Sequence, residues 1–172
     1  MMKTFKEFLE ESSLSRIKSK SDKGGIATMS ASRADKSAKE NRARAKQLDR
    51  DIKGKGLPGA TKVTGSYVEK GDDGKEKRVK ERSHVVTSGK KGKRAFKKAV
   101  KSLGKKYGQD SVLTQTKKTG TLSATRKGGL GKKPKDKRPM GSTKRVGLGK
   151  FKPQGKNPEG QSQIKGKTFT YG

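Results

Sequence analysis

The stretch Gly59-Ala-Thr-Lys-Val-Thr-Gly-Ser-Tyr-Val-Glu69 begins the one part of the chain, residues 59–116, with enough apolar periodicity to build a core. A second strand-like run, Arg78-Val-Lys-Glu-Arg-Ser-His-Val-Val-Thr87, follows after a polar segment with two glycines. Glycine tolerates the positive φ angles that turns require. The pattern therefore predicts a hairpin of two strands, over residues 61–69 and 78–87, joined by a longer polar loop.

Residues 93–107 have the strongest helical periodicity in the chain. Apolar residues recur at the spacing of one helix face, and lysines crowd the rest of the circumference. The apolar positions are Phe96, Ala99, Val100, Leu103 and Tyr107. Gly108 follows as a natural C-terminal cap. Residues 111–114 then have the composition of a strand, and Leu122 lies on a candidate for one more.

Upstream of the hairpin, the sequence predicts a strand and a helix. Residues 25–30 form a short alternating run that is typical of a strand. A thin apolar stripe predicts a helix over residues 36–52, with Asp35 as its N-cap. The predicted order is therefore strand, helix, strand, strand, helix, strand. Two α+β topologies fit this order: the split βαβ arrangement of ferredoxin-like folds, and a generic antiparallel sheet with the helices packed elsewhere.

The chain divides into three regions by composition. Residues 1–24 carry Phe5, Phe8 and Leu9 at helical spacing, which predicts an amphipathic helix that docks on the core or binds a partner, followed by a polar linker over residues 19–25. Residues 25–125 form the small α+β domain. Residues 126–172 are rich in glycine, lysine and proline, and predict a disordered or extended basic tail.

The tail contains a repeated motif. Thr125-Arg-Lys-Gly-Gly-Leu-Gly-Lys132 recurs as Thr143-Lys-Arg-Val-Gly-Leu-Gly-Lys150. It is either a coincidence of low-complexity sequence or a duplicated contact motif, in which basic side chains meet phosphates and glycines let the backbone approach. Phe169 and Tyr171, near the end, are suited either to stacking on bases or to docking back on the core.

Net charge is the clearest functional signal in the composition. The 172 residues include 47 Lys and Arg against 16 Asp and Glu, a formal charge of +31, and hydrophobic residues are only 25%. Such a surplus favours a polyanionic partner, because binding relieves self-repulsion and releases counterions. Nucleic acid, DNA or RNA, is the first expectation. A membrane surface is not expected, because few apolar anchors accompany the basic residues.

Several classes of site are excluded by residue counts. The chain has no cysteine and one histidine, so disulfides, thiolate chemistry and multi-histidine metal sites are excluded. No metal or cofactor is expected. No apolar run is long enough to span a membrane, and the N-terminus lacks a continuous apolar signal segment. We therefore expect the protein in a virion or in the host cytoplasm.

One group of residues resembles a catalytic constellation. It gathers at predicted strand ends and consists of Tyr67, Glu69, Glu81, Arg82, Ser83, His84, Gln109, Asp110 and Ser111. Glu69 and Glu81 flank one hairpin and would suit acid–base work or metal binding if they paired. Glutamates on strands beside many lysines are more often solvated salt-bridge partners, and a lone strand histidine is more often packed. The phosphate-loop and dinucleotide spacings are both absent.

Three segments carry a family resemblance. Gly65-Ser-Tyr-Val-Glu69, Glu81-Arg-Ser-His-Val-Val86 and Tyr107-Gly-Gln-Asp-Ser-Val-Leu113 resemble an uncharacterised family of small proteins from large contractile-tailed bacteriophages, marine and cyanophage-like. The likeness spans roughly residues 25–114, and Met2-Lys-Thr-Phe-Lys-Glu-Phe-Leu9 resembles the start of many such phage proteins. The family implies an origin and no activity. The basic tail departs from its core pattern.

These observations favour a non-enzymatic, sequence-tolerant nucleic-acid-binding phage protein. The alternatives are a virion structural protein whose basic tail binds acidic protein surfaces, and an enzyme that acts on nucleotides or nucleic acid through Glu69, Glu81 and His84. The residues expected to bind phosphates lie on the second helix and in the tail: Lys97, Lys98, Lys101, Lys105, Lys106, Arg126, Lys127, Lys132, Lys144, Arg145 and Lys150.

Overall fold

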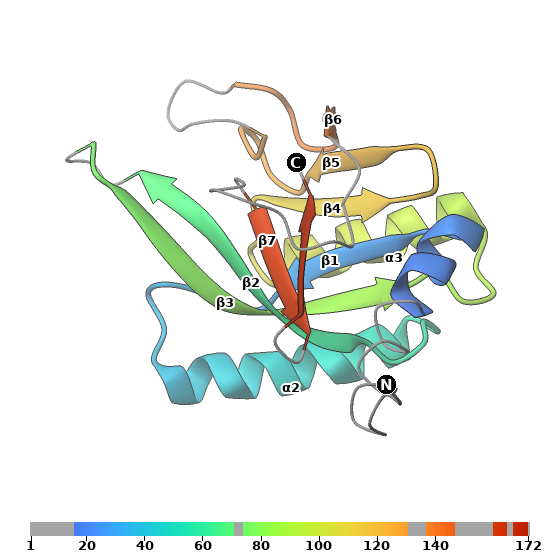
Figure 1. The fold of residues 1–172 in the computed structure, drawn as a ribbon, viewed down its shortest axis with the longest axis horizontal. Helices are drawn as coiled ribbons and strands as arrows, with labels where there is room; N and C mark the ends of the chain where they lie inside the picture. Colours follow the sequence, from blue (N-terminus) through green and yellow to red (C-terminus); the bar gives the residue numbers. More distant parts are fainter. Residues whose placement is uncertain (1–15, 71–73, 131–136, 147–159, 165–166, 172) are drawn as a thin grey trace, which may run out of the picture.

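The computed structural model describes residues 16–70, 74–130, 137–146, 160–164 and 167–171, and gives only the backbone of 66–70, 79, 160–164 and 167–171. It confirms the α+β class. One antiparallel sheet runs in the order β6-β5-β4-β1-β3-β2-β7-β8 (Figure 1). Its strands are β1 Ile26–Ser30, β2 Thr61–Lys70, β3 Glu76–Thr87, β4 Ser111–Gln115, β5 Gly120–Ala124, β6 Thr143–Val146, β7 Gly160–Ile164 and β8 Lys167–Tyr171.

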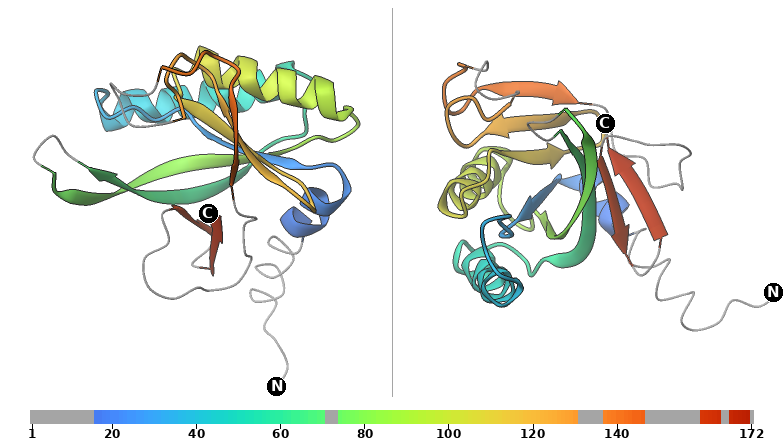
Figure 2. Two further views of the ribbon diagram at one scale, coloured as in Figure 1. Left: turned by 90° about the horizontal axis from the view of Figure 1, so that it is seen from above. Right: turned by 90° about the vertical axis from the view of Figure 1, so that its left-hand side faces the viewer.

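The centre of the sheet has the ferredoxin-like order β4-β1-β3-β2. Both β1 and β2 pair antiparallel with β3, so they run parallel to each other across it. The connections β1 to β2 and β3 to β4 carry the two main helices, α2 Ala38–Gly54 and α3 Lys93–Lys106. Figure 2 shows both helices on one face of the sheet, so the split βαβ topology is the one of the two predicted that the chain adopts.

Helix α2 begins two residues later than predicted. Ser37, rather than Asp35, is its N-cap: the Ser37 hydroxyl accepts from the Glu40 amide while the Glu40 carboxylate accepts from the Ser37 amide. This reciprocal capping box satisfies two amide donors, whereas an Asp35 cap would satisfy one. Asp35 instead lies within ion-pair distance of Arg33 and Lys36.

Helix α3 agrees closely with the prediction. Its five predicted apolar positions are all buried: Phe96, Ala99, Val100, Leu103 and Tyr107. Gly108 has φ +69 and directly follows the C-cap residue, which suits glycine because a Cβ disfavours that conformation. The helix packs its apolar stripe on the sheet together with Leu48 and Ile52 of α2 and Ala27, Met29 and Val86 of the central strands.

The opposite face of the sheet is also buried at its centre. Side chains alternate along a strand, so Ile26, Ser30, Ser83 and Val85 lie on the face away from the α2–α3 layer. All four are buried. Residues 16–23, of which the last five were predicted to belong to a polar linker, are helical, and Ile17 and Ser21 in this segment are buried. Figure 2 shows this helix on the face away from α2 and α3.

The described parts of the basic C-terminal segment include turns and three strands that join the sheet. Strand β6 pairs with β5, β7 pairs with β2, and β8 pairs with β7. Figure 2 shows the hairpin β7–β8 on the side away from the helices, where the sheet curls. The repeated motif lies partly outside the described residues, as does the amphipathic helix predicted around Phe5 and Phe8. Among the helices described, none is long and apolar enough to cross a bilayer.

Candidate active site

Small polar residues lie in the middle of the sheet face that points away from α2 and α3. Ser30 of β1 lies opposite Ser83 of β3, and Ser83 lies opposite Val63 of β2. The Ser30 hydroxyl donates to the carbonyl of Arg82 at 2.8 Å. Serine side chains are short, so the layer of side chains over the backbone is thin in this part of the face.

Glu81 lies two residues from Ser83 on the same face and is half-buried. Its cross-strand partner on β2 is Gly65, which is buried. A Cβ at Gly65 would come within 2.7 Å of the Ser83 hydroxyl oxygen, so no larger residue fits there without a shift. The strand neighbours of Glu81, Lys80 and Arg82, alternate to the other face. The carboxylate therefore stands beside a glycine in a chain that is otherwise strongly basic.

The structure does not pair Glu69 with Glu81, which agrees with the interpretation of these glutamates as structural rather than as an acid–base pair. Glu69 lies opposite Lys77, while Glu81 lies opposite Gly65. Gly65 and Glu69 are four residues apart on β2, about 13 Å along an extended strand. The two glutamates flank the hairpin in sequence, but the long register separates them.

His84 is also separated from Glu81, because it lies on the helix face of β3. Its side chain is fully buried beneath α2, and its Nε2 lies 3.2 Å from the Asp49 carboxylate, which also pairs with Lys62 at 3.0 Å. Nδ1 has no hydrogen-bond partner among the described residues, and the 3.2 Å contact of Nε2 with Asp49 does not have the geometry of a hydrogen bond. Burial lowers the pKa of His84, against the opposing effect of Asp49. His84 is therefore a packed, neutral histidine.

Three members of the predicted constellation, Gln109, Asp110 and Ser111, lie at the junction of α3 and β4. The Gln109 carbonyl accepts from the Thr125 hydroxyl. The Asp110 carboxylate pairs with Arg126 Nε at 2.5 Å. These contacts tie the start of β4 to the chain after β5. Tyr67 lies in β2 opposite Val79.

A second polar cluster lies between α2 and α3. The Asp51 carboxylate accepts from the Tyr107 hydroxyl at 2.5 Å and from Gln47 at 3.1 Å, and pairs with Lys106 at 2.7 Å. The Lys106 and Tyr107 donors lower the pKa of Asp51 to about 2, and burial with the Asp51 contact raises the pKa of Tyr107. A pocket of about 320 Å³ opens beside this cluster, lined by Asp51, Gly54, Lys55, Ser102, Leu103 and Lys106.

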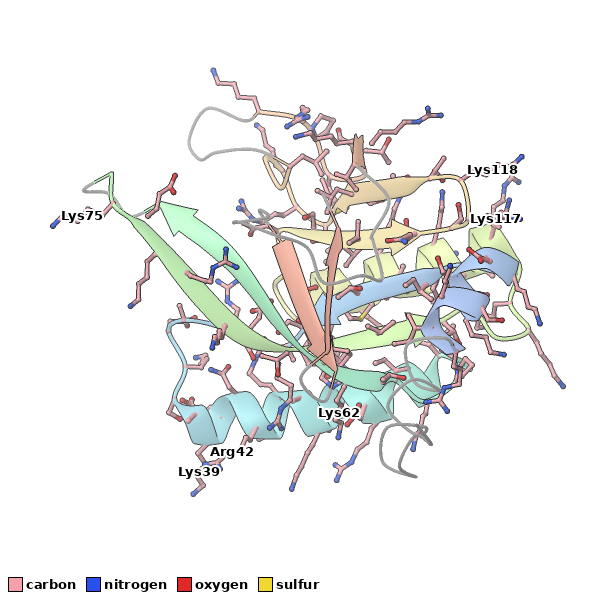
Figure 3. The ribbon with its side chains drawn as sticks, in the orientation of Figure 1. Lys39, Arg42, Lys62, Lys75, Lys117 and Lys118 are labelled. Carbon is pink, nitrogen blue, oxygen red and sulfur yellow. The ribbon has the colours of Figure 1, made fainter. Side chains whose placement is uncertain are left out.

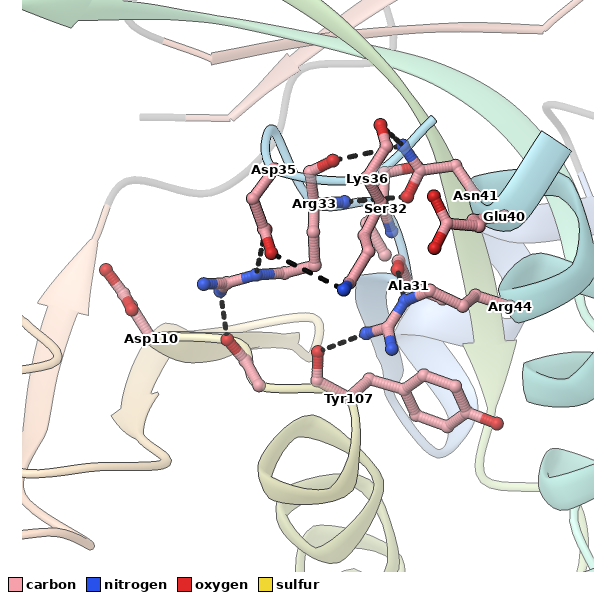
Figure 4. Close-up of polar contacts among 12 residues, drawn as sticks. Ala31, Ser32, Arg33, Asp35, Lys36, Glu40, Asn41, Arg44, Tyr107 and Asp110 are labelled. Atoms are coloured by element: carbon pink, nitrogen blue, oxygen red, sulfur yellow. Dashed lines mark hydrogen bonds and ion pairs between the residues drawn. The ribbon is translucent and has the colours of Figure 1, made fainter. Parts of the chain in front are cut away.

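Hydrogen bonds connect the loop between β1 and α2, and the start of α2, to the C-terminal end of α3 (Figure 4). Asn41 accepts from the Arg33 amide at 2.9 Å and donates to the Arg33 carbonyl at 3.0 Å. Arg33 and Arg44 then donate to the carbonyls of Gly108 and Tyr107, at 2.5 and 2.9 Å. These guanidinium groups satisfy carbonyls at the helix end. Asn41, which interrupts the predicted apolar stripe, is a structural residue of this loop.

The residues predicted to bind phosphates lie on α3, after β5 and on β6. Lys97, Lys98 and Lys105 are exposed on α3, Lys101 is half-buried, and Lys127, Lys144 and Arg145 are exposed after β5 and on β6. Lys106 and Arg126 are engaged with Asp51 and Asp110. Lys132 and Lys150 lie outside the described residues. Figure 3 labels basic side chains on several elements: Lys39 and Arg42 on α2, Lys62 on β2, Lys75 before β3, and Lys117 and Lys118 beyond β4.

A comparison with protein families identifies the chain. The model of the S-adenosylmethionine lyase family matches residues 27–172, which include α2, α3 and the described strands except the first residue of β1, and leave out the helix of residues 16–23. No curated protein sequence matches. Because the family is one of lyases, the prediction of a non-enzymatic nucleic-acid-binding protein is wrong, and so is its alternative of a virion structural protein. That prediction came from the net charge, which describes the surface and does not reveal a small-molecule site. The chain belongs to the S-adenosylmethionine lyase family.

Proposed function

We propose that this protein cleaves a carbon–sulfur bond of S-adenosylmethionine. The observation that carries the proposal is the family match, which runs from Ala27 through the end of the chain and so takes in both helices and nearly all of the sheet. A lyase breaks such a bond without adding water. Cleavage moves the bonding electrons onto the sulfonium sulfur, which leaves as a neutral thioether. The carbon it leaves either loses a proton from its neighbour and becomes an alkene, or forms a new bond to the substrate's own carboxylate and closes a ring.

We place the reaction beside Gly65 and Glu81, on the sheet face away from α2 and α3. The substrate is a cation at sulfur, and its ammonium group is also positive. A carboxylate in the site would complement these positive charges. Glu81 is a half-buried carboxylate opposite Gly65, and its strand neighbours Lys80 and Arg82 alternate to the other face.

The pocket beside Asp51 is the weaker candidate. Both Asp51 oxygens already accept from Lys106, Tyr107 and Gln47, so this carboxylate is neutralised. Lys55 and Lys106 line the same pocket and would repel a sulfonium. The low pKa of Asp51 reflects a structural ion pair, which perturbs titration as strongly as an active site does.

Charge at sulfur disappears as the bond breaks, so a carboxylate beside sulfur favours the bound substrate over the transition state. Glu81 would then act as a substrate anchor. If it instead accepts a proton from the carbon chain during an elimination, it acts as a general base. The two roles differ in their kinetic effect: loss of an anchor raises KM, while loss of a base lowers kcat.

The test is an assay of the purified full chain with S-adenosylmethionine, followed by mass spectrometry of the thioether, whose mass identifies the broken bond. We expect turnover, and a loss of about 10²-fold in kcat/KM for Glu81→Gln. Glu76→Gln is the matched control, because Glu76 is exposed on the same strand. No turnover by the wild type would refute the function, whereas full activity of Glu81→Gln would move the site elsewhere.

The resemblance to phage proteins bears on where the activity takes place. S-adenosylmethionine is made inside cells, so we propose that the enzyme acts in the cytoplasm of an infected host rather than within the virion. Quantitative proteomics of purified virions and of infected cells would separate the two locations. Enrichment of the chain in virions would count against this part of the proposal.

A further inference from the structure

Helix α3 differs from helix α2 in its charges. Seven of its 14 residues are Lys or Arg, and none is Asp or Glu. Helix α2 carries three acidic residues, Glu40, Asp49 and Asp51, and each contacts a described residue. Between Glu81 and Asp110 the chain has no acidic residue at all. The basic residues of α3 are therefore not neutralised from within the helix or from the loop before it.

These charges destabilise the helix that carries them. Arg94 and Lys98 are four residues apart, as are Lys97 and Lys101, and like charges at this spacing repel each other. The first turn has no acidic residue at the positive end of the helix dipole, and the N-cap, Gly92, makes no side-chain hydrogen bond. Because the surplus lowers the stability of the helix, it indicates a use in contacts with another molecule.

The charges form one exposed surface. The apolar stripe of α3 is buried, and six basic residues, here called the α3 surface, lie on the rest of the helix: Lys93, Arg94, Lys97, Lys98, Lys101 and Lys105. Lys101 is half-buried and the other five are exposed. None of the six forms an ion pair with a described residue, whereas Lys106 beside them pairs with Asp51 at 2.7 Å. Six cations are therefore available to a partner.

Two further lysines extend this surface at one end. Lys117 and Lys118 are exposed in the turn between β4 and β5 (Figure 3). A short connection joins α3 to β4, and a Cβ at Gly104, near the end of the helix, would come within 2.5 Å of Val112 in β4. The strand therefore runs back beneath the helix, and the β4–β5 turn lies toward the N-terminal end of α3.

The composition and length of the α3 surface favour carboxylates as its partner groups. Five of its six residues are lysines, which act as point charges, and no aromatic, Asn or Gln side chain on α3 accompanies them to contact bases. Residues 93–105 span about 18 Å of helix. Beyond them lie the carboxylates of Asp51 and Asp110, which would repel the phosphates of a nucleic-acid strand that continued past the helix. A short acidic segment of a protein ends before them.

We propose that the α3 surface binds a segment rich in Asp and Glu on a partner protein. Carboxylates placed among the lysines would relieve the repulsion along the helix. Helix α3 and the proposed lyase site beside Glu81 lie on opposite faces of the sheet. The inference therefore goes beyond the proposed function and does not depend on it.

The test uses a fluorescently labelled decaglutamate peptide as the probe, with the full chain in 0.15 M salt. Fluorescence anisotropy should detect binding, and the triple variant Arg94→Gln, Lys97→Gln, Lys98→Gln should weaken it roughly tenfold. The matched control is the triple variant Lys39→Gln, Arg42→Gln, Lys46→Gln, exposed on α2. Each variant loses one Arg and two Lys, so both change the net charge from +31 to 31 − 3 = +28. We expect the α2 variant to bind within about twofold of the wild type.

A ten-nucleotide single strand of DNA is the second probe, and its affinity should change equally in the two variants. Equal losses of decaglutamate binding in the two variants would overturn the proposal, because net charge alone would then account for binding. So would a greater loss for DNA than for decaglutamate in the α3 variant, which would assign the surface to nucleic acid.

Thermal unfolding provides an independent readout. The α3 variant should melt roughly 2 °C above the wild type, because two like-charged pairs are removed. A lower melting temperature would show that these side chains stabilise the fold, which contradicts the premise of a binding surface. Neither assay requires turnover, so a protein without lyase activity that still binds decaglutamate through α3 would refute the proposed function and support this inference.

Discussion

The two faces of the sheet differ in what they bury. The face under α2 and α3 packs large apolar side chains, among them Leu48, Val100 and Leu103, against the strands. The face away from those helices combines an apolar patch around Ile26 and Val85 with serines, a buried glycine and a half-buried glutamate. In a chain that is only 25% hydrophobic, the helix face takes most of the large apolar residues for stability. The polar part of the other face is where we propose that the reaction takes place.

The largest expected effect tests whether stability resides in the helix face. Leu48 is fully buried in α2, so Leu48→Ala should lower the free energy of unfolding by about 2–5 kcal/mol. The physical cause is lost burial together with the cavity that remains. Urea unfolding measures it, with exposed Lys46→Ala on the same helix as a control that should change stability by less than about 0.5 kcal/mol. A small change for Leu48→Ala would contradict the division between the faces.

The next prediction concerns the polar cluster at the border of the helix layer. Tyr107→Phe removes the hydroxyl that donates to Asp51 at 2.5 Å. A hydrogen bond to a charged group is worth about 1.5–3 kcal/mol, so we expect a loss of stability in that range with unchanged kcat/KM. Urea unfolding and the lyase assay measure the two quantities. A large fall in activity with normal stability would transfer the active site to the pocket beside Asp51.

Gly65→Ala tests the other face in the same way. The added Cβ would lie 2.7 Å from the Ser83 oxygen, and the Ser83 side chain must move to relieve the contact. Overpacking of this kind costs roughly 1–2 kcal/mol. We also expect KM to rise several-fold, because the added methyl group occupies space beside Glu81, where we place the substrate. A variant with unchanged KM would show that substrate does not approach Gly65.

A smaller effect depends on pH. Burial lowers the pKa of His84 in the folded state below its ordinary value of 6.5. The unfolded chain therefore takes up the proton first as pH falls, so the stability contributed by neutral His84 is present above about pH 6.5 and declines below it. Stability measured between pH 8 and pH 5 should fall for the wild type. His84→Leu is expected to flatten this part of the profile, and an equal decline in that variant would contradict the assignment.

Local patterns in the sequence predicted much of the fold. The stripes of α2 and α3 and the alternation around Val63 and Val85 report contacts between near neighbours, which repeat at fixed periods. The capping box at Ser37 and Glu40 was equally visible in sequence, as a serine three residues before a glutamate. Asp35 is an equally good N-cap by residue type, so residue type alone does not decide at which of the two residues the helix begins.

The arrangement of the candidate site was not predictable in this way. Glu81 belongs to the predicted constellation, but the hairpin register, which depends on every pair along two long strands, puts Gly65 opposite it instead of Glu69. Strand β7 joins the sheet through its pairing with β2, a contact between segments about a hundred residues apart. Nothing local specifies such a pairing.

The smallest expected effect sharpens the contrast between the site and the surface around it. S-adenosylmethionine carries one net positive charge, and the protein carries +31, so the long-range field opposes association. Added salt screens this field: the Debye length falls from about 30 Å at 0.01 M to about 8 Å at 0.15 M. We therefore expect kcat/KM to rise several-fold over that range, the opposite of electrostatic steering. Adenosine, which is neutral, provides the control, and its affinity should stay nearly constant. If kcat/KM falls as salt is added, attraction by carboxylates near Glu81 outweighs the field of the whole protein, and the site is more strongly acidic than its neighbours on β2 and β3 indicate.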